Sequence, residues 1–556
     1  MFLRRLVELS ERPGYESPPR GYAPKPIRYI IELDEAGRPL TPHLTDTADA
    51  KDRNLQRGHE RLSPTLRRGS TPRALLLADN GTYVLGLAAE GRTEDSSYVR
   101  ERHAAFRELI DECARATDDP DVRAVAAFYA SGAAASLNLT DVVVSENFTF
   151  SVASRLPIDS PVVKRFWAER QETRDNVMQC VVCGKHKPVL RTLETMIKRV
   201  PGGNTSGTSI ISFNAKAFES YGLEQSFNAP ICTDCAERSH YVLNKLLSDE
   251  RTRLTVGESA LVAWTRDEAP FPFLDMLQQP DPDLVRELMR SPFTARHASV
   301  DPNRFYAALL GASGGRTQVR SWLDTTVDEA MQNLARWFSQ QRIVGPWGED
   351  PKPLSVRSLA AATVRDMKEV TSRTVSSLYL AALTGYPVPP SVIPLVVART
   401  RADQTVQQNH AAALKLALCA TDSRMEENMV ELDLSNHSPA YLCGRLLAEL
   451  EQAQRSANPS AKATIIDRYY GTAATAPASV FGTLIQGAQA HLGKLERDRP
   501  GAYNAIQARM EEILAALDTF PATLNLNEQA LFALGYYHQR AANRAAATAN
   551  REEKSA

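Results

Sequence analysis

Along the N-terminal third of the chain, apolar residues gather in short blocks separated by polar turns, a pattern that predicts strands. Ile27–Leu33 is one such block, and Asp141–Phe150 is another candidate. Two further apolar runs flank Asp79-Asn80-Gly81, which predicts a β-hairpin with its corner at these three residues. Residues 96–116 instead repeat their apolar positions at helical spacing. The pattern therefore predicts a mixed α+β domain over residues 1–175.

Beyond residue 250 the pattern becomes mostly helical. The run Arg304–Gly311 predicts a strand, and Val319–Gln341 predicts a helix whose apolar stripe includes Trp322. We expect residues 251–424 to be an α-rich completion of the main body. From 425 to 545 one helical pattern follows another, which predicts a compact all-α bundle, and residues 546–556 are expected to be a disordered tail. The predicted bundle helices are Ala440–Ser456, Pro477–Leu495, Tyr503–Phe520 and Asn527–Ala541.

Composition and charge place the chain among soluble globular proteins. It has 556 residues, enough for about two to four domains, with 43% hydrophobic and 24% charged residues. The formal net charge is −1, so any contact with nucleic acid has to come from local patches. No apolar stretch reaches the about 18 residues of a membrane-spanning helix, and the start does not resemble a secretory signal. We therefore expect a cytoplasmic protein with no membrane partner.

Four of the seven cysteines form two Cys-x-x-Cys pairs, the spacing of zinc knuckles. The pairs are Cys180 with Cys183 and Cys232 with Cys235, roughly fifty residues apart along the chain. Four thiolates complete a tetrahedral zinc site and leave no open position for a catalytic water. The sequence thus predicts a structural zinc ion. Buried thiols that are paired by chance and a redox dithiol are the alternatives.

The segment between the knuckles combines basic residues with a glycine-rich loop. Exposed backbone N–H groups and nearby cations suit a phosphate, whereas a solvated basic loop is the alternative. The loop is not a nucleotide-binding P-loop, because Thr208 stands where the lysine is required. Ile210–Asn214, after the loop, predicts a strand. The candidate phosphate-contacting residues are Lys198, Arg199, Gly202, Gly203, Asn204, Thr205, Ser206 and Gly207.

These observations combine into an α+β fold with a mixed N-terminal body, a zinc-knuckle insertion and a C-terminal all-α helical bundle. The insertion, residues 176–250, contains both the knuckles and the glycine-rich loop. We expect the zinc ion to hold the base of the loop.

No set of catalytic residues is apparent in the sequence. His59-Glu60 does not continue into the H-E-x-x-H pattern of zinc proteases, and no group of acids with a histidine suggests a nuclease centre. We therefore expect that the protein is not an enzyme. A zinc-stapled protein–protein scaffold without direct DNA contact is an alternative function, and a hydrolase within the N-terminal domain is a weaker one.

A series of short motifs occurs in order along nearly the whole chain. The motifs are Pro18–Tyr22, Ile27–Leu33, Leu77–Gly86, Gly203–Gly207, Ile211–Asn214, Ala217–Gly222, Gln225, Asn228–Pro230, Tyr241–Leu247, Leu310–Trp322, Thr464–Tyr470 and Ala533–Arg540. In this order they resemble the large subunit of the type I-C CRISPR Cascade surveillance complex. No single motif is diagnostic, so the resemblance depends on their succession along one chain.

The resemblance implies a DNA-recognition subunit for antiviral defence, with no active site of its own. In such complexes a guide RNA pairs with the target strand, while protein reads a short adjacent duplex motif, the PAM. The large subunit is implied to promote strand separation and to help recruit the helicase-nuclease. The other implied partners are double-stranded target DNA, the guide RNA ribonucleoprotein, the RNA-capping and RNA-coating subunits, and the small subunit. In this family the bundle is also made separately from an internal start, for which Met425 and Met429 are candidates.

The resemblance also singles out Asn80 and Asn147 as candidate readers of the PAM, because asparagine amides at chain corners can reach minor-groove acceptors. The commoner role of an asparagine at such a corner is to cap the turn. In the bundle, basic residues that include Arg445 and Arg455 are candidates for contact with a displaced strand, although most such residues only solvate helices. Many relatives lack the full set of four cysteines, so the zinc is expected to be local reinforcement.

Overall fold

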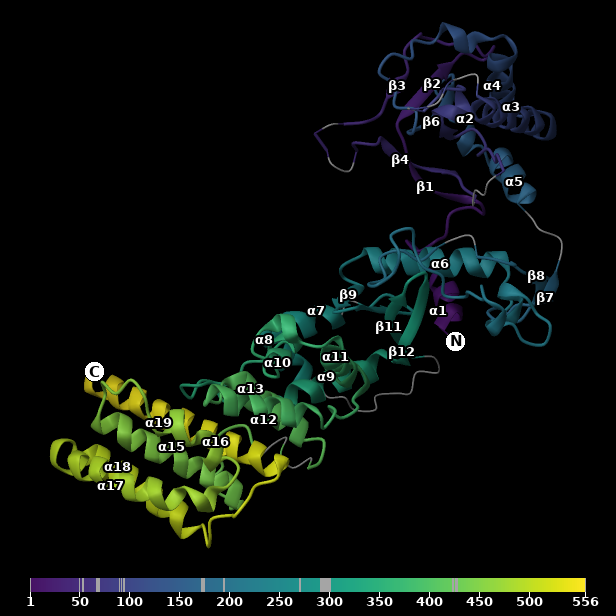
Figure 1. The fold of residues 1–556 in the computed structure, drawn as a ribbon. Helices are drawn as coiled ribbons and strands as arrows, with labels where there is room; N and C mark the ends of the chain where they lie inside the picture. The colour runs from purple at the N-terminus through teal and green to yellow at the C-terminus, as the bar shows by residue number, and fades with distance from the viewer. Residues whose placement is uncertain are drawn as a thin grey trace. The chain divides into compact units, whose positions relative to one another are not determined.

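The computed structural model describes residues 2–555 except 50, 53–54, 67–70, 90, 92, 94–95, 172–175, 194–195, 270–271, 291–301, 423–424 and 426–428. The chain divides into two compact units (Figure 1). Unit 1 comprises residues 1–197 and 209–245, and unit 2 comprises residues 198–208 and 246–556. The chain therefore enters unit 2 once through the glycine-rich loop before it returns to unit 1.

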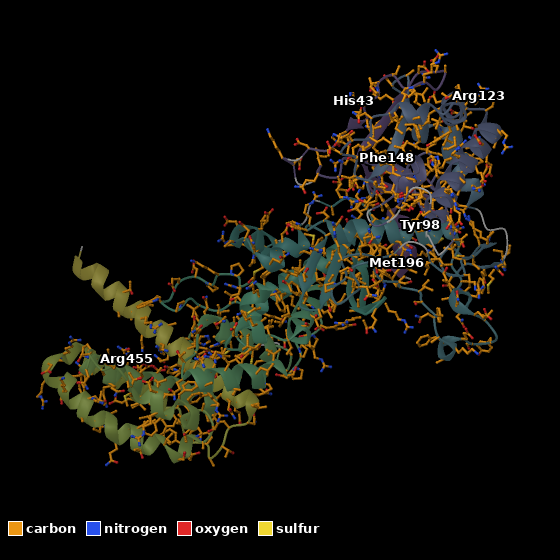
Figure 2. The ribbon with its side chains drawn as sticks, turned by 45° about the horizontal axis from the view of Figure 1, so that its top comes forward. His43, Tyr98, Arg123, Phe148, Met196 and Arg455 are labelled. Atoms are coloured by element: carbon orange, nitrogen blue, oxygen red, sulfur yellow. The ribbon has the colours of Figure 1, made fainter. Side chains whose placement is uncertain are left out.

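Unit 1 is built around a four-stranded sheet with the order β3-β2-β6-β5. Strands β2 and β6 run parallel and place Ile31 opposite Phe150, while the outer strands pair antiparallel. Phe148, labelled in Figure 2, packs its ring against Tyr29 of β2 at 4.8 Å between centroids. Helix α4 covers β2 and β6 and buries Phe128 completely. The elements of unit 1 are α1 (Phe2–Leu9), β1 (Tyr22–Ile27), β2 (Tyr29–Leu33), β3 (Thr45–Asp46), β4 (His59–Pro64), β5 (Asp79–Asn80), α2 (Gly81–Val84), α3 (Ser97–Thr117), α4 (Pro120–Ala130), β6 (Asn147–Val152), α5 (Pro161–Arg170), β7 (Val177–Gln179), β8 (His186–Pro188) and α6 (Thr233–Ser248), whose last residues enter unit 2.

The β-hairpin predicted at Asp79-Asn80-Gly81 is wrong. Asp79 and Asn80 form the short strand β5, and the chain turns directly into helix α2. The Oδ1 atom of Asn80 accepts hydrogen bonds from the backbone N–H groups of Thr82 (3.1 Å) and Tyr83 (3.4 Å). This side-chain cap satisfies N–H groups that have no partner within the helix, and it therefore favours a helix over a second strand.

Unit 2 starts with an antiparallel sheet in the order β12-β11-β10-β9 and continues as helices. The predicted strand Arg304–Gly311 is confirmed as part of β11. One apolar core extends from this sheet through the middle helices into the C-terminal bundle. The elements of unit 2 are β9 (Arg253–Val256), β10 (Ser259–Thr265), α7 (Phe273–Gln278), α8 (Pro282–Arg290), β11 (Arg304–Ser313), β12 (Arg316–Thr326), α9 (Val327–Gln340), α10 (Val356–Ala361), α11 (Ser372–Thr384), α12 (Val392–Asp403), α13 (Gln408–Leu418), α15 (Pro439–Ala457), α16 (Ile465–Ala473), α17 (Phe481–Asp498), α18 (Pro500–Ala515) and α19 (Leu526–Ser555).

The helix predicted from Val319 begins only at Val327, because the preceding residues form strand β12. Trp322 belongs to this strand, and its ring stacks on Tyr306 of β11 at 5.8 Å between centroids. Aromatic pairs between neighbouring strands stabilise a sheet, and here they outweigh the helical spacing of the sequence. Thr326 then ends the strand and caps α9 by accepting a hydrogen bond from the Glu329 N–H at 3.1 Å.

The predicted C-terminal bundle is confirmed, with α15 in contact with α16, α17, α18 and α19 (Figure 1). Two glycines bring α15 and α19 close together. A Cβ atom on Gly444 would lie 2.0 Å from the Phe532 carbonyl oxygen, and one on Gly535 would lie 2.2 Å from that of Tyr441. No residue with a side chain fits at either position without moving a helix. Helix α19 continues to Ser555, through the segment expected to be a tail.

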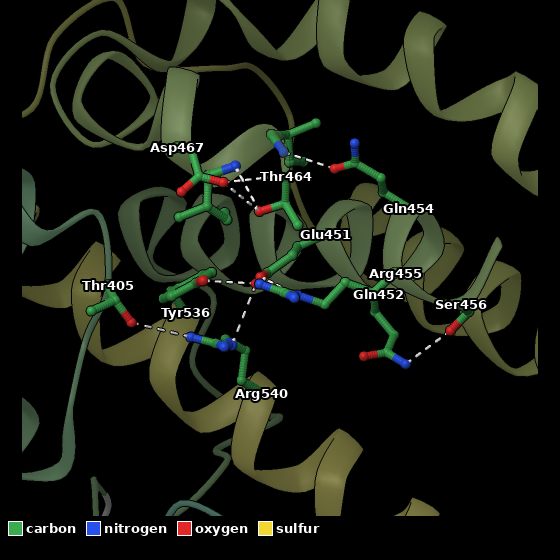
Figure 3. Close-up of polar contacts among 12 residues, drawn as sticks. Thr405, Glu451, Gln452, Gln454, Arg455, Ser456, Thr464, Asp467, Tyr536 and Arg540 are labelled. Atoms are coloured by element: carbon green, nitrogen blue, oxygen red, sulfur yellow. Dashed lines mark hydrogen bonds and ion pairs between the residues drawn. The ribbon is translucent and has the colours of Figure 1, made fainter. Parts of the chain in front are cut away.

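A buried carboxylate of α15 organises the polar interior of the bundle. Glu451 accepts hydrogen bonds from the Tyr536 hydroxyl (2.7 Å) and from Arg455 Nε (2.7 Å), and its Oε2 lies 3.4 Å from Arg540 Nε (Figure 3). The Glu451 side chain is only 3% exposed. A buried charge is tolerated when such partners surround it, so these arginines contribute to the structure of the bundle.

We predict that acid destabilises unit 2 through its buried histidines. Burial, with a further contribution from Lys415, lowers the pKa of His538 to about 3, and burial lowers the pKa of His410 to about 4. In the unfolded chain both pKa values return to about 6.5, so the unfolded state binds more protons below that pH. The unfolding free energy is therefore fully retained well above pH 6.5. By pH 5, protonation of each of these histidines in the unfolded chain lowers it by about 2 kcal/mol.

The check is chemical denaturation at pH 7 and at pH 5. His538→Gln should reduce the loss of unfolding free energy between the two pH values, whatever its effect at pH 7. His437 is exposed, so His437→Gln is the control and should keep the loss of the unmodified chain. Equal losses in all three proteins would contradict the prediction.

Candidate functional site

Four cysteines converge in unit 1, and their sulfur atoms all lie within 4.8 Å of one another. Cys180, Cys232 and Cys235 are buried, and Cys183 is exposed. A tetrahedral zinc ion with Zn–S bonds of about 2.3 Å holds its sulfurs roughly 3.8 Å apart, so the cluster is close to the required spacing. The residues present therefore fit a metal ion, and four thiolates favour zinc.

The two knuckles are formed by different backbone structures. The first occupies the turn between β7 and β8, where the Gly184 N–H donates to the Cys180 carbonyl oxygen at 2.8 Å. The second lies at the start of α6, where Cys235 is in the first turn. The Cys232 N–H points at the Cys180 sulfur at 3.4 Å. Backbone N–H groups and the positive end of a helix dipole stabilise thiolates, so the fold prepares the cluster for a cation.

The cluster also forms a small core of its own. Val182 and Ile231 are buried around the cysteines, and Leu3 and Val7 of α1 pack against them. Arg238 of α6 ties α1 to the cluster by donating to the Val7 carbonyl oxygen at 3.1 Å. So few apolar side chains form only a weak core, and a structural metal ion is the usual reinforcement in such cases.

The thiol protons indicate how a bound cation would act on the cluster. A hydrogen bond from Cys235 lowers the pKa of Cys232 to about 5, while the same contact raises the pKa of Cys235. Burial raises the pKa of Cys180. One thiolate is thus easily formed in this group. Formation of a second thiolate at this spacing is disfavoured, because the two negative charges repel each other. A bound divalent cation removes that repulsion and releases the remaining protons.

The glycine-rich loop belongs to unit 2, where it packs on the turn between β11 and β12. The Asn204 N–H donates to the Gly314 carbonyl oxygen at 3.1 Å, and the Thr208 and Thr317 hydroxyls are 2.6 Å apart in a buried contact. A Cβ atom on Gly203 would lie 2.5 Å from Thr208 Cγ2, so this position requires glycine. We expected a zinc ion to hold the base of the loop. The contacts of Asn204 and Thr208, which lie within unit 2, determine the shape of the loop.

The outer residues of the loop face solvent. Lys198, Arg199, Gly202 and Asn204–Ser206 are exposed, whereas Gly207 is buried and Gly203 is half-buried. Arg199 has a left-handed backbone (φ 62°), a conformation that costs about 1 kcal/mol and that the surrounding contacts must maintain. The predicted strand Ile210–Asn214 is wrong, because these residues form bends and irregular backbone.

Asn80 and Asn147 are brought together by the sheet, where they are directly paired between β5 and β6. Asn80 uses its Oδ1 atom as the cap of α2. Asn147 donates from Nδ2 to the Pro26 carbonyl oxygen at 2.9 Å. Both side chains are half-buried and have structural contacts. Their role in reading DNA stays a prediction.

Arg445 differs from the expectation of a DNA-facing residue. Arg445 is 1% exposed, and its guanidinium donates to Gln539 (2.9 Å) and Glu512 (3.0 Å). Arg445 therefore cannot meet a nucleic-acid strand. Arg455 is half exposed at 52% and is paired with Glu451.

The sequence analysis missed the turn that supports the glycine-rich loop. Gly314 and Gly315 occupy its tip, and Arg316 begins β12 beside them. A second glycine pair shortly after the predicted strand Arg304–Gly311 was the available signal, but a helix rather than a second strand was predicted to follow it. Arg316 belongs to the same unit as Lys198 and Arg199.

Comparison with known proteins identifies one family. The family described as CRISPR-associated protein (Cas_Csd1) matches residues 4–544. No curated protein matches the chain. Among the described helices, none is both long enough and apolar enough to cross a membrane.

We predict that the purified chain contains about one zinc ion, bound by the four cysteines. Cys183→Ser should lower the zinc content at least twofold, and because Cys183 is exposed the change leaves the small core in place. Acidification should release the ion, since protons compete for the thiolates. Elemental analysis at several pH values measures both effects.

Cys419→Ser is the control, because Cys419 lies in unit 2, outside the cluster, and should leave the zinc content unchanged. A chain that binds no zinc with all four cysteines reduced would contradict the prediction. The same holds if the Cys183→Ser protein retains the zinc content of the unmodified chain.

Proposed function

The chain belongs to the Cas_Csd1 family of CRISPR-associated proteins, and from this premise we propose that it is the large subunit of a type I-C Cascade complex. The family match spans residues 4–544, and the succession of motifs that suggested this subunit lies within it, from Pro18 to Arg540. In this role the protein works with a guide RNA ribonucleoprotein, RNA-capping and RNA-coating subunits and a small subunit. It carries out no chemical step of its own.

The proposed task is to recognise the PAM duplex of the target DNA. The guide RNA supplies the sequence match, so the protein needs to hold a short duplex and help to open it. It then helps to recruit the helicase-nuclease. These steps require contacts with phosphates for position and a few contacts with base edges for discrimination.

The observation that best supports this proposal is the glycine-rich loop. Its outer residues Lys198, Arg199 and Asn204–Ser206 are exposed, and its inner residues are fixed on the β11–β12 turn. A rigid loop loses little conformational freedom when it binds. Exposed N–H groups and cations on such a loop are suited to a sugar–phosphate backbone.

We expect Lys198→Ala with Arg199→Ala to weaken duplex binding for all sequences by about tenfold or more. Removal of two cations should also reduce the slope of log affinity against log salt by about 2. The measurement is a titration of the reconstituted RNA-guided complex with PAM-containing duplex at several salt concentrations.

A matched control removes the same charge elsewhere in unit 2. Lys352 and Arg357 are exposed and lie outside the loop, so Lys352→Ala with Arg357→Ala should keep the slope of the unmodified complex. If the loop variant and the control bind equally well, the loop is not part of the DNA site. A zinc-stapled scaffold without DNA contact would then be the better description.

Asn80 allows a separate test of base reading. Asp caps helices as well as Asn does, so Asn80→Asp keeps an acceptor for the N–H groups of Thr82 and Tyr83 but removes the amide donor. If the Asn80 amide reads a minor-groove acceptor, this variant should lose about 1 kcal/mol or more of discrimination at one PAM position.

Asn138→Asp is the control for the added charge, since Asn138 also accepts a backbone hydrogen bond, from Thr140, with its Oδ1. Competition between duplexes with single PAM substitutions measures the discrimination. An Asn80→Asp complex with unchanged selectivity would leave Asn80 as a helix cap without a role in reading DNA.

A further inference from the structure

A cavity of about 290 Å³ lies in unit 2 beside the last helix. Its wall consists of Pro346, the turn Thr405–Gln408 between α12 and α13, and one face of α19. Helix α19 contributes Arg540 and Arg544 to this wall. The volume is at the lower end of the roughly 300–1,000 Å³ of small-ligand pockets, which suits one compact group.

The cavity wall contains more positive than negative charge. The charges of Arg540 and Arg455 both act on Arg544, and so does the Glu451 carboxylate. Glu451 already accepts hydrogen bonds from Tyr536 and Arg455 (Figure 3). Burial, followed by the charge of Arg540, lowers the pKa of Arg544. The residues that line the cavity include Arg540 and Arg544 and no carboxylate, which favours an anion in it.

The contacts of Arg544 leave it able to bind that anion. Its Nη1 donates to the Pro346 carbonyl oxygen at 3.3 Å, and its guanidinium carbon lies 5.0 Å from the centre of the Trp347 ring. The nearby Glu349 carboxylate accepts from the Trp347 N–H at 2.8 Å. A guanidinium presents five N–H donors, so these contacts leave others for an oxyanion. The start of α13 at Gln408 adds the positive end of a helix to the wall.

Trp347 indicates which anion fits. Its side chain is 57% exposed although it is large and apolar, and the guanidinium of Arg544 lies over its ring. An exposed aromatic ring next to phosphate-binding arginines is the arrangement that binds unpaired bases of single strands. A paired base in a duplex cannot stack on a side chain in this way.

We propose that this cavity, the arginine pocket, binds a phosphate of a single nucleic-acid strand through Arg540 and Arg544, with an adjacent base stacked on Trp347. The site is separate from the glycine-rich loop, and the proposal does not rest on the function assigned to that loop. The pocket contacts backbone and ring faces, so it accepts strands of different sequence.

The test measures binding of the full chain to a fluorescein-labelled 12-nucleotide oligothymidine by fluorescence anisotropy. We expect Arg544→Gln to weaken binding about tenfold or more and to reduce the salt slope by about 0.7, the value for one phosphate of a single strand. Arg544→Lys keeps the charge without the planar fork and should bind with intermediate affinity. Trp347→Ala should weaken binding about fivefold or more, because a stacked base contributes about 1–3 kcal/mol.

Arg497 is exposed on α17 and lies outside the pocket, so Arg497→Gln is the charge-matched control and should bind within about twofold of the unmodified chain. Thermal unfolding of each variant verifies that it is folded. Unchanged affinity in folded Arg544→Gln or Trp347→Ala protein overturns the proposal. Displacement of the strand by an equal concentration of inorganic phosphate also overturns it, because the pocket would then recognise free phosphate.

Discussion

Charge in a poorly solvated place has to be compensated, and this constraint organises both units of the protein. In unit 1 four thiols lie within 4.8 Å, a spacing at which four thiolates are stable only with a cation between them. In unit 2 the buried Glu451 carboxylate is stable because Tyr536 and Arg455 donate to it. The cysteine cluster and the Tyr536–Glu451 hydrogen bond each join elements that are distant in the sequence, so these contacts help to fix the fold.

The same constraint separates cations that are compensated within the fold from cations that are exposed to solvent. Arg445 is buried between Gln539 and Glu512, so its charge is already used within the bundle. The loop residues Lys198 and Arg199 are instead exposed to solvent. Counting basic residues along a helix cannot distinguish these cases, because the distinction depends on which neighbours the fold supplies.

Local signals in the sequence predicted the features that are themselves local. Cysteine spacing predicted the cluster of four thiols, because each knuckle is a single turn of backbone. The corner at Asp79-Asn80-Gly81 was misread because an asparagine followed by glycine fits both a hairpin turn and a helix cap. Trp322 has helical spacing to its apolar neighbours, yet its contacts with Tyr306 on the adjacent strand decide the structure. Those contacts, like the packing of the glycine-rich loop on Gly314, join distant parts of the sequence.

A chain with a net charge of −1 gains no long-range attraction to DNA, so the nucleic-acid contacts proposed for it have to be short-ranged and preformed. The glycine-rich loop meets this requirement by its rigidity, since Gly203 and the Thr208–Thr317 contact fix it on the sheet of unit 2. A protein whose guide RNA performs the sequence matching needs no large reading surface. A few preformed phosphate contacts are then sufficient, and the remaining charged residues are free to stabilise the fold.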